Sequence, residues 1–373
     1  MIVLKRNIIV NATATRESGA LTILNQFIDH IPADTSDQYY IFVDWNYRVI
    51  RKHQNIIYVL VNTVSWLKRI SWDAYGLKKW INKHEVLPNL VISLQNTGVN
   101  LQSNIPQLIY YHQPFPLTSY RWSLFRKDER PFFLYKNVYP YFVSQYLRKN
   151  THVVVQIPSI KQAFISKFKI DSELVHVIPP DVKTIDYKLI SLVKYDDDFI
   201  HFIFPATPLI YKNHICLVHS LSELHAVRPD LLKKIRIHFT FEKSKSIQLY
   251  RHIQEHGLEE NFIFEGVLPY DKLLGMYRVM RALLFPSFIE TFGLPLIEAA
   301  SAGIPVLVSD LPYARDVIGG YEGASFIKYD DISAWTHHII HLCEKKDVYL
   351  SYKNEQQGSN WDAFFRLVDK LKI

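Results

Sequence analysis

Residues 280–304, MRALLFPSFIETFGLPLIEAASAGI, change from an apolar run to a polar turn and then to a helical pattern. Residues 282–285 are all apolar, which is typical of a parallel strand buried on both faces, and Pro286 and Ser287 end that run. Pro295 suits the first turn of a helix, where its missing N–H is not needed. The stretch therefore predicts a strand, a tight turn and the start of a helix.

The predicted turn is suited to bind an anion or a sugar oxygen. Gly293 lets the backbone approach a ligand closely, and the first N–H groups of a helix have no partner inside it. Glu290 and Glu298 bracket the turn, with seven residues between them. A pair at this spacing arises by chance about once in a chain with this much glutamate, so the spacing alone is weak evidence. Glu298 also has a simpler reading, as an early helical acid favoured by the helix dipole.

The whole string FPSFIETFGLPLIEA, followed by a turn at 303–306 into another strand, is far more specific. It resembles the donor site of glycosyltransferase family four, the glycosyl transferases group 1, which are retaining enzymes. The resemblance is strong over residues 199–335 and weaker over the first 180. It implies an α/β fold of the GT-B type, with two Rossmann-like domains facing each other across a cleft. It also implies a nucleotide-sugar donor as substrate, with no cofactor and no metal.

The length of 373 residues exceeds one ordinary core and suits two α/β domains. We expect an acceptor-side domain, a linker, a nucleotide-sugar-binding domain and a terminal helix, at 1–180, 181–198, 199–355 and 356–373. In similar enzymes the terminal helix folds back onto the first domain. Asp196–Asp198 resemble the DxD metal motif of another glycosyltransferase fold, but their position before a strand favours a solvated turn.

The composition narrows the partners of the chain. A net charge of +7 fits nucleic acid, anionic lipid or a phosphorylated substrate, but no nucleic-acid-binding motif accompanies it, so nucleic acid is not expected. Two cysteines in a long chain favour a reducing compartment. Lys5 and Arg6 interrupt the first apolar run too early for a signal peptide, and no apolar run approaches the roughly twenty residues of a membrane span. We therefore expect a cytoplasmic protein whose membrane contact, at the inner face, is peripheral.

Two features of the first domain are candidates for the site: an acceptor-side loop and a histidine that would face the donor. Residues 6–11 predict a strand, and Ser18, Gly19 and Ala20 follow it at a helix start, where they form either a simple N-cap or a loop that a substrate approaches. The resemblance implies the second role, although Ala20 stands where relatives usually have glycine. His112 follows a predicted strand and matches a functional histidine of the family; an isolated histidine there is more often structural.

The resemblance also assigns the donor-side residues. It implies that Glu290, His112 and Lys212 take part in catalysis, with Lys212 holding the donor diphosphate and Glu290 lying by the sugar. Glu298 would accept the ribose hydroxyls, since a carboxylate can accept both. Asn213 is a plausible N-cap beside Lys212. The remaining donor-binding candidates are the turn residues Thr291, Phe292, Gly293 and Leu294, Val267 at the nucleobase, and Thr207, where relatives often have arginine.

Residues 110–149 combine seven lysines or arginines with thirteen aromatic residues. Cationic and aromatic side chains both suit the boundary between water and an anionic membrane, so the segment is a candidate docking surface. Alternatively, the aromatic side chains from 132 to 146 are the buried side of a helix.

The sequence therefore predicts transfer of one sugar to a lipid-linked oligosaccharide or polysaccharide, as in the synthesis of surface glycans such as lipopolysaccharide. The donor is expected to be GDP- or UDP-linked, and the oligomeric state is left open. A non-catalytic subunit that binds a nucleotide-sugar is the alternative from another class. A GT-B epimerase or phosphorylase is a further enzymatic alternative.

Overall fold

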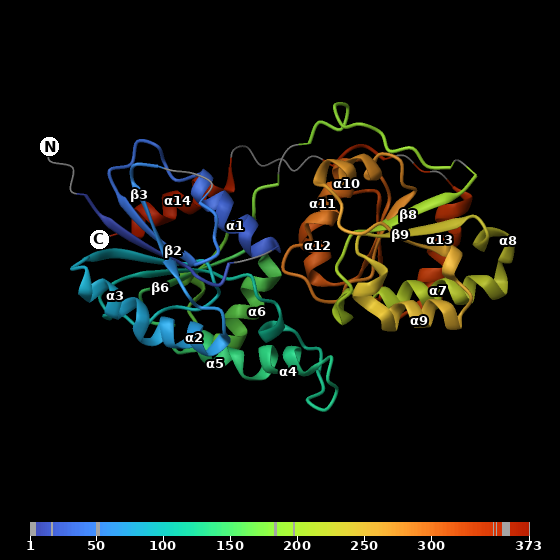
Figure 1. Ribbon diagram of the computed structural model, residues 1–373. Helices are drawn as coiled ribbons and strands as arrows, with labels where there is room; N and C mark the ends of the chain where they lie inside the picture. Colours follow the sequence, from blue (N-terminus) through green and yellow to red (C-terminus); the bar gives the residue numbers. More distant parts are fainter. Residues whose placement is uncertain are drawn as a thin grey trace. The chain divides into compact units, whose positions relative to one another are not determined.

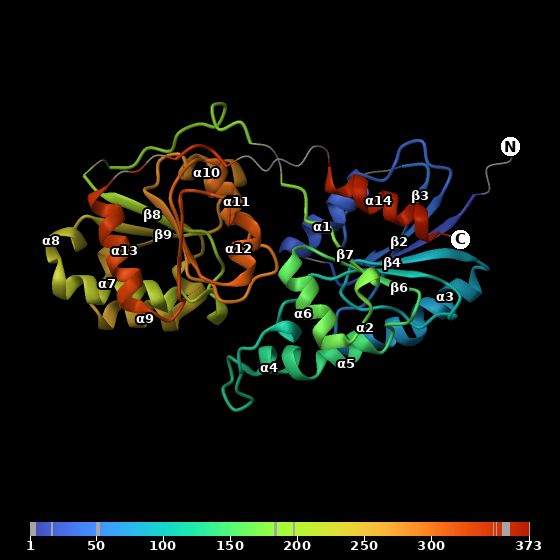
Figure 2. The same ribbon diagram turned by 180° about the vertical axis from the view of Figure 1, so that it is seen from behind.

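The computed structural model describes residues 5–15, 18–49, 53–182, 185–196, 198–345, 347, 349–352 and 359–372. The chain forms two compact units, Met1–Asp181 with Gln356–Ile373, and Val182–Glu355. Each unit is built on one parallel sheet with helices on both faces (Figures 1 and 2). The predicted class, two Rossmann-like α/β sheets, is therefore confirmed, whereas the cleft between them stays a prediction.

The sheet of the first unit has the strand order β3-β2-β1-β4-β5-β6-β7, and all its printed pairings are parallel. Its strands are β1 (Asn7–Ala12), β2 (Gln38–Asp44), β3 (Ile56–Val61), β4 (Pro88–Ser93), β5 (Gln107–Tyr110), β6 (Thr151–Val155) and β7 (Val175–Val177). Its helices are α1 (Ser18–Asp29), α2 (Trp66–Ser71), the π-helical η1 (Trp72–Gly76), α3 (Leu77–Lys83), η2 (Phe115–Leu117), α4 (Arg130–Asn137), α5 (Tyr139–Ser144), α6 (Pro158–Phe168), η3 (Ser172–Leu174) and α14 (Asn360–Leu371).

Alternating side chains of β1 separate the two core layers of this unit, because successive residues of a strand point to opposite faces. Ile8 and Val10 pack in the cluster that includes side chains of α1 and α14. Ile9 packs instead with Leu77 and Ile81 of α3. Figure 1 shows α1 and α14 on one face of the sheet and α2 and α3 on the other.

Helix α14 completes the first core although it is the last helix of the chain. Trp361, Phe364, Phe365 and Val368 are buried in the same cluster as Phe27 and strands β1, β2 and β4. The spacing of these four residues places them on one face of the helix. The helix thus belongs to the core of unit 1.

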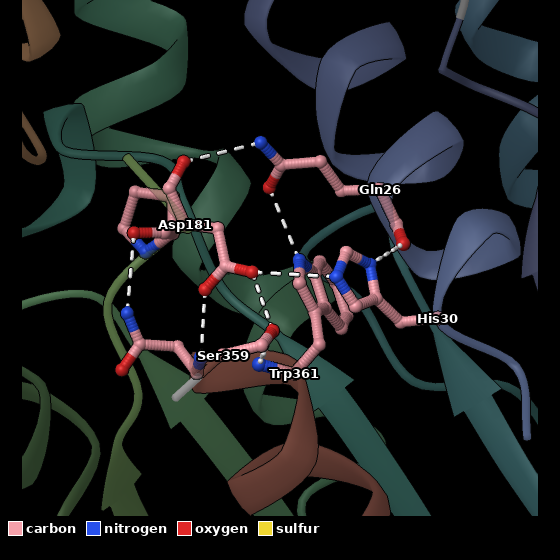
Figure 3. A network of polar contacts seen from close by, with 7 residues as sticks. Gln26, His30, Asp181, Ser359 and Trp361 are labelled. Carbon is pink, nitrogen blue, oxygen red and sulfur yellow. Dashed lines mark hydrogen bonds and ion pairs between the residues drawn. The ribbon is translucent and has the colours of Figure 1, made fainter. Parts of the chain in front are cut away.

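Asp181 fixes the start of α14 at the point where the first segment of unit 1 ends (Figure 3). Its carboxylate accepts the N–H of Asn360 at 2.7 Å and the Ser359 hydroxyl. His30 Nε2 lies 3.5 Å from the same carboxylate. Gln26 donates to the Asp181 carbonyl at 3.2 Å and accepts the Trp361 indole N–H at 3.1 Å. Asp181 therefore satisfies one of the N–H groups that the helix cannot pair internally.

The second unit repeats the design with the order β10-β9-β8-β11-β12-β13, again with parallel pairings. Its strands are β8 (Ile200–Phe204), β9 (Ile235–Phe239), β10 (Phe262–Phe264), β11 (Ala282–Phe285), β12 (Val306–Ser309) and β13 (Ala324–Ile327). Its helices are η4 (Ile210–Lys212), α7 (His214–Val227), α8 (Pro229–Leu232), η5 (Lys243–Ser246), α9 (Ile247–Glu255), η6 (Glu259–Asn261), α10 (Tyr270–Tyr277), α11 (Leu294–Ser301), α12 (Pro312–Ile318) and α13 (Ile332–Glu344).

The strand order locates the ligand-binding edge of each sheet. Parallel α/β sheets bind ligands beyond the carboxyl ends of their strands, where the order reverses direction. In unit 1 this switch lies between β1 and β4, and in unit 2 between β8 and β11. The loops after these four strands are therefore where a site is expected.

Across the residues listed above as described, no helix is both long and apolar enough to cross a membrane. The same residues contain no group of three or more His, Cys, Asp or Glu side chains that could hold a metal ion. Asp197 lies outside the described residues, and the Asp196 carboxylate accepts the N–H of Asp198 at 3.1 Å.

Candidate functional site

Lys212 and Glu290 meet at the switch point of the second sheet. Lys212 ends η4, after β8, and Glu290 follows β11 by five residues. The Lys212 ammonium lies 2.5 Å from Glu290 Oε1, and the two side chains are 15% and 12% exposed. The two predicted catalytic residues of this unit are therefore an ion pair, a contact that the sequence did not predict.

The loops that carry this pair are fastened to one another. The Phe288 N–H donates to the Tyr211 carbonyl at 2.9 Å. Ser287 donates its hydroxyl to Glu290 Oε1 at 2.8 Å, so this oxygen accepts both the ammonium and the hydroxyl. The Tyr313 hydroxyl donates to the Ser287 carbonyl at 2.7 Å. Ser287 therefore positions Glu290, and Glu290 positions Lys212.

Asn213 occupies the predicted N-cap position of α7, but its side chain does not cap that helix. Its φ is +59°, in the left-handed region that asparagine tolerates. Its amide nitrogen donates instead to the carbonyls of Pro286 at 3.2 Å and Tyr329 at 2.8 Å. The prediction of a side-chain cap was wrong, because the Asn213 amide group donates to these carbonyls of neighbouring loops.

The turn before α11 presents unpaired backbone donors. Within the residues that the structure describes, the N–H groups of Thr291, Phe292, Gly293 and Leu294 donate no hydrogen bond. Gly293 has φ +85°, and a Cβ there would lie 3.1 Å from the Leu296 side chain, so both conformation and space favour glycine. Pro295 follows in the first turn of α11, as the sequence predicted. The four donors and the helix start together favour an anion or sugar oxygen.

Glu298 lies one turn into α11 and is buried under three tyrosines. Its Oε1 accepts the Tyr270 hydroxyl at 2.9 Å, and its Oε2 accepts the Tyr277 hydroxyl at 3.3 Å. Tyr187 donates to its backbone carbonyl at 2.7 Å. Burial raises the pKa of Glu298, while the hydrogen bonds from Tyr270 and Tyr277 oppose the rise. Each carboxylate oxygen keeps a second lone-pair direction with which it can accept from a ligand.

The two remaining donor-side candidates are exposed. Val267 follows β10 and exposes 87% of its surface, so its apolar side chain is open to a ligand. Thr207 follows β8 and is exposed, and its carbonyl accepts the N–H of Leu209 at 2.8 Å. Thr207 itself offers a hydroxyl and no charge to a ligand.

A pocket of about 200 Å³ lies at the switch point of the first sheet. Its walls come from the loops after β1, β4 and β5 and from helices α2, α4 and α5. Its aromatic lining residues are Trp66, Tyr135, Tyr139, Phe142 and Tyr146. Its polar lining residues are Thr15, Arg69, Asp73, Gln95, Asn96, Thr97, His112, Gln113 and Gln145. Aromatic surfaces together with hydrogen-bonding groups suit a sugar, whose rings have apolar faces and polar edges.

Asp73 is the polar centre of this pocket. It lies in η1 and accepts hydrogen bonds from Asn11 and Gln95 at 2.9 Å each and from Thr97 at 3.0 Å. Gln95 in turn accepts the N–H of Ala14 at 3.0 Å. Burial raises the pKa of Asp73 to about 7, although the three hydrogen bonds and the charge of Arg69 oppose the rise. Asp73 thus ties the loop after β1 to the loop after β4.

His112 lies beside this network as a neutral ring. The backbone N–H of His112 donates to Asn96 Oδ1 at 2.6 Å, and its ring Nε2 lies 3.4 Å from the Asn96 amide nitrogen. Burial lowers the pKa of His112 to about 4. Ala20 lines the same pocket, and the space around Gly19 is open, whereas the Ser18 side chain lies outside the described residues. His112 and Ala20 are predicted site residues that lie far apart in the sequence, and the structure places both in the lining of one pocket.

Comparison with known proteins identifies the domain that carries this site. The family model described as "Glycosyl transferases group 1" matches residues 195–358. The chain carries a glycosyl transferases group 1 domain. This group 1 domain contains the Lys212–Glu290 pair, the turn before α11 and Glu298, and the resemblance stated from the sequence is confirmed.

Two similar proteins are named as mannosyltransferases. The O-antigen chain mannosyltransferase RfbU of Salmonella typhimurium is 24% identical over 246 residues, which are 65% of this chain and 66% of that protein. The O-antigen chain mannosyltransferase B of Escherichia coli is 34% identical over 87 residues, which are 23% of this chain and 22% of that protein. These alignments therefore span less than two thirds of either relative.

The fold of the whole chain is also shared. Sucrose-phosphate synthase from Thermosynechococcus elongatus has a TM-score of 0.65 at 16% identity, covering 92% of this chain and 90% of that one. At this identity the likeness shows the fold alone. The GT-B class predicted from the sequence is therefore confirmed, while the roles of individual residues in the group 1 domain stay predictions.

Several residues of these sites were not predicted. Ser287, Tyr270 and Tyr277 lie within the group 1 domain, and only their partners Glu290 and Glu298 were recognised from the motif. In unit 1, Trp66 has the helical spacing of a core residue, but it is 46% exposed and lines the pocket. Asp73 could have been noticed as the one acid within the apolar sequence SWDAYGL.

The raised pKa of Asp73 predicts a specific pH dependence of stability. The native carboxyl takes up a proton below about pH 7, and the unfolded one does so only near its ordinary pKa of 3.8. The native state therefore binds the extra proton between these values, and the free energy of unfolding falls as pH rises through this window, by about 4 kcal/mol in total. We expect Asp73→Asn to remove that fall, because asparagine does not titrate.

This prediction is checked by urea unfolding across pH 4–7, followed by tryptophan fluorescence. Six of the seven tryptophans lie in unit 1, so the signal reports mainly on that unit. The side-chain oxygen of asparagine can still accept the hydrogen bonds from Asn11 and Gln95. Its amide nitrogen can donate to Thr97, because the threonine hydroxyl can accept a hydrogen bond as well as donate one. Equal pH slopes for wild type and variant would contradict the expected proton uptake by Asp73.

Proposed function

We propose that the protein is a retaining, metal-independent glycosyltransferase that moves one hexose from a nucleotide-sugar to a glycan or lipid-linked glycan. The observation that carries the proposal is the fastened Lys212–Glu290 pair beside four unpaired N–H groups, at the switch point of a group 1 domain. This arrangement offers one cation and several donors to a diphosphate and polar groups to a sugar.

The donor would be held by three parts of the second unit. Lys212 and the N–H groups of the turn stabilise the diphosphate, and they supply positive charge where a metal would otherwise be needed. Glu298 accepts the ribose hydroxyls on the oxygens that Tyr270 and Tyr277 already orient. Val267 provides an exposed apolar surface for the nucleobase. Glu290 accepts a hydroxyl of the sugar while it holds Lys212.

The reaction would exchange one bond at the anomeric carbon for another. The bond to the leaving phosphate oxygen breaks, the acceptor oxygen bonds to the same face, and the leaving phosphate takes the proton of the acceptor hydroxyl. Lys212 stabilises the charge that develops on that phosphate. His112 is neutral because its pKa is low, so it orients a hydroxyl by hydrogen bonding without adding charge.

The acceptor would enter through the pocket of unit 1. Trp66 and Tyr139 offer flat apolar surfaces, and Asn96 and Arg69 offer hydrogen bonds to hydroxyls. The named relatives are mannosyltransferases of O-antigen chains, so mannose is the first sugar to test and a lipid-linked glycan the first acceptor. A cytoplasmic enzyme at the inner face of the membrane fits such an acceptor.

A thermal-shift panel of GDP-, UDP-, dTDP- and CMP-sugars in the presence of a chelator tests the donor. A ligand at about a hundred times its Kd stabilises the folded state by roughly 2.7 kcal/mol. We expect GDP- or UDP-mannose to raise the melting temperature and to be consumed when acceptor is added. Stabilisation without turnover would favour the alternative of a non-catalytic binding subunit, and turnover without acceptor would favour an epimerase.

Replacing Glu298 with glutamine is expected to weaken donor binding about tenfold or more. The amide loses charge-assisted hydrogen bonds to the ribose diol. Tyr270→Phe is the matched control, because it removes one hydroxyl from Glu298 and keeps the carboxylate. Titration calorimetry should find a raised Kd for Glu298→Gln and a nearly unchanged one for Tyr270→Phe. Equal affinities of Glu298→Gln and wild type would remove the ribose assignment.

A further inference from the structure

The loop between η2 and α4 is built around a buried carboxylate. Glu129 is buried, accepts the N–H of Ser123 at 2.7 Å and pairs with Arg126 at 2.9 Å. Arg130 donates to the Leu124 carbonyl at 3.0 Å. Trp122 is buried beneath the loop, with its ring centroid 4.7 Å from that of Phe132. The loop is therefore held in one conformation by its own side chains.

This anchored loop presents an apolar tip to solvent. Phe125 is 90% exposed and Leu124 is 45% exposed. The backbone next to these side chains is held, because the Ser123 N–H donates to Glu129 and the Leu124 carbonyl accepts from Arg130. Figure 1 shows the loop before α4 extending beyond that helix, and Figure 2 shows the same from behind. The tip therefore presents two neighbouring apolar side chains to solvent.

Cations surround the tip. Arg121, Arg126, Lys127 and Arg130 are exposed within ten residues, against one exposed acid, Asp128. The charge of Arg126 is neutralised by its ion pair with Glu129. The other three cations therefore face only one negative charge, that of Asp128. The positive charge also acts on Lys136, whose pKa is lowered first by burial and then by Lys167 and Arg121. The neighbourhood of the tip is thus positive.

We propose that the tip formed by Leu124 and Phe125, with the cations around it, docks the first unit on the surface of an anionic lipid bilayer. A convex tip of two side chains is too small for a stable protein interface, which buries about 800 Å² on each partner. A bilayer accepts such a tip, because acyl chains close around it while anionic headgroups meet the cations.

Helices α4 and α5 carry further exposed apolar side chains near the loop. Leu134 and Tyr141 are exposed, whereas Tyr139 and Phe142 line the pocket of unit 1. The aromatic run is therefore only in part the buried side of a helix, and its role in docking belongs to the proposal. The inference rests on the proposed function in one respect, because docking would give access to a lipid-linked acceptor. Its test is independent of that function, since vesicle binding is measured without any transfer reaction.

Sedimentation with vesicles of phosphatidylglycerol and phosphatidylcholine, and of phosphatidylcholine alone, tests the proposal. We expect wild type to bind the anionic vesicles and to be released between about 0.1 M and about 1 M salt, because the Debye length shortens from about 10 Å to about 3 Å. Leu124→Ser with Phe125→Ser, and Arg121→Glu with Lys127→Glu, should each lower binding roughly tenfold or more. Arg126 and Arg130 are left intact because they hold the loop.

Matched controls lie on the same unit. Lys78→Glu with Lys79→Glu changes the net charge equally on the exposed side of α3, and Leu87→Ser removes a side chain that is 80% exposed. Both should bind vesicles like wild type. Equal losses in the tip and control variants would mean that net charge alone drives binding, and the docking surface would be rejected.

A Phe125→Trp variant reports where the contact lies. Anionic vesicles should shift its emission to the blue, relative to wild type, because the indole enters an apolar environment. A shift that appears with protein concentration and without lipid would assign the tip to a second copy of the chain, and vesicle binding without a shift would assign the contact to another surface. Nucleotide-sugar binding by the tip variants should equal that of wild type, so a failed transfer assay and a failed docking surface remain distinguishable.

Discussion

Glu290→Gln is expected to lower the rate of sugar transfer at saturating donor about a hundredfold, the size of effect seen when one preorganised electrostatic group is removed. The substitution keeps the side-chain volume and an oxygen for the Ser287 hydroxyl, but it removes the charge that holds Lys212 at 2.5 Å. The ammonium would then lose its fixed position beside the diphosphate. Donor affinity should change little, because Lys212 and the N–H groups of the turn remain.

Steady-state kinetics and donor titration together check this split between turnover and binding. Glu344→Gln is the matched control, because Glu344 also forms an ion pair, at 2.6 Å with Arg228, but both partners are more than a third exposed. That exposed pair contributes little, and its loss should leave the rate unchanged. Full activity of Glu290→Gln would show that the pair is structural and would remove Glu290 from the proposed mechanism.

Phe364→Ala is expected to lower the free energy of unfolding of the first unit by about 3–5 kcal/mol, the range for deleting a buried phenylalanine side chain. Phe364 is fully buried, and its ring lies 6.0 Å from that of Phe27 and 6.2 Å from that of Tyr110. Tyr110 ends β5, two residues before His112, so the cavity would also loosen the pocket edge.

Hydrogen exchange separates the two units in this experiment. Amides of β1, β2 and β5 should exchange faster in Phe364→Ala, while those of β8 and β11 should exchange as in wild type. Arg366→Ala, on the exposed face of the same helix, should change stability by less than about 0.5 kcal/mol. Equal effects on both sheets would contradict the assignment of α14 to the first core.

The regular elements could be predicted where periodicity is strong. The strand Ala282–Phe285 was predicted with the bounds that the structure gives, because continuous apolar runs are typical of strands buried in parallel sheets. The spacing of Trp66, Ile70, Leu77 and Trp80 is helical, and residues 66–83 form one continuous helical stretch, but its middle, η1, is π-helical. The spacing of apolar residues does not distinguish a π-helical turn, which has one extra residue, from an ordinary α-helical turn. Asp73 lies in this π-helical turn.

The sequence predicted individual residues of the site, but it did not predict the contacts between them. A motif names Glu290, Glu298 and Lys212, but it does not show that Lys212 pairs with Glu290, since they are 78 residues apart. The tyrosines on Glu298 come from another helix, α10, and no local pattern links Tyr270 to it. Contacts between loops depend on sheet order and register, which become known only once the strands are assembled.

The place of α14 in the first core has a consequence for synthesis on the ribosome. Residues 1–181 and the whole second unit are made before Trp361 and Phe364, so the first unit lacks one side of its core during most of synthesis. Until then the surfaces of Phe27 and Tyr110 that meet α14 are open to water or to chaperones. A fragment ending at residue 181 would keep this opening permanently, and a soluble first unit would need residues 359–372 joined to it.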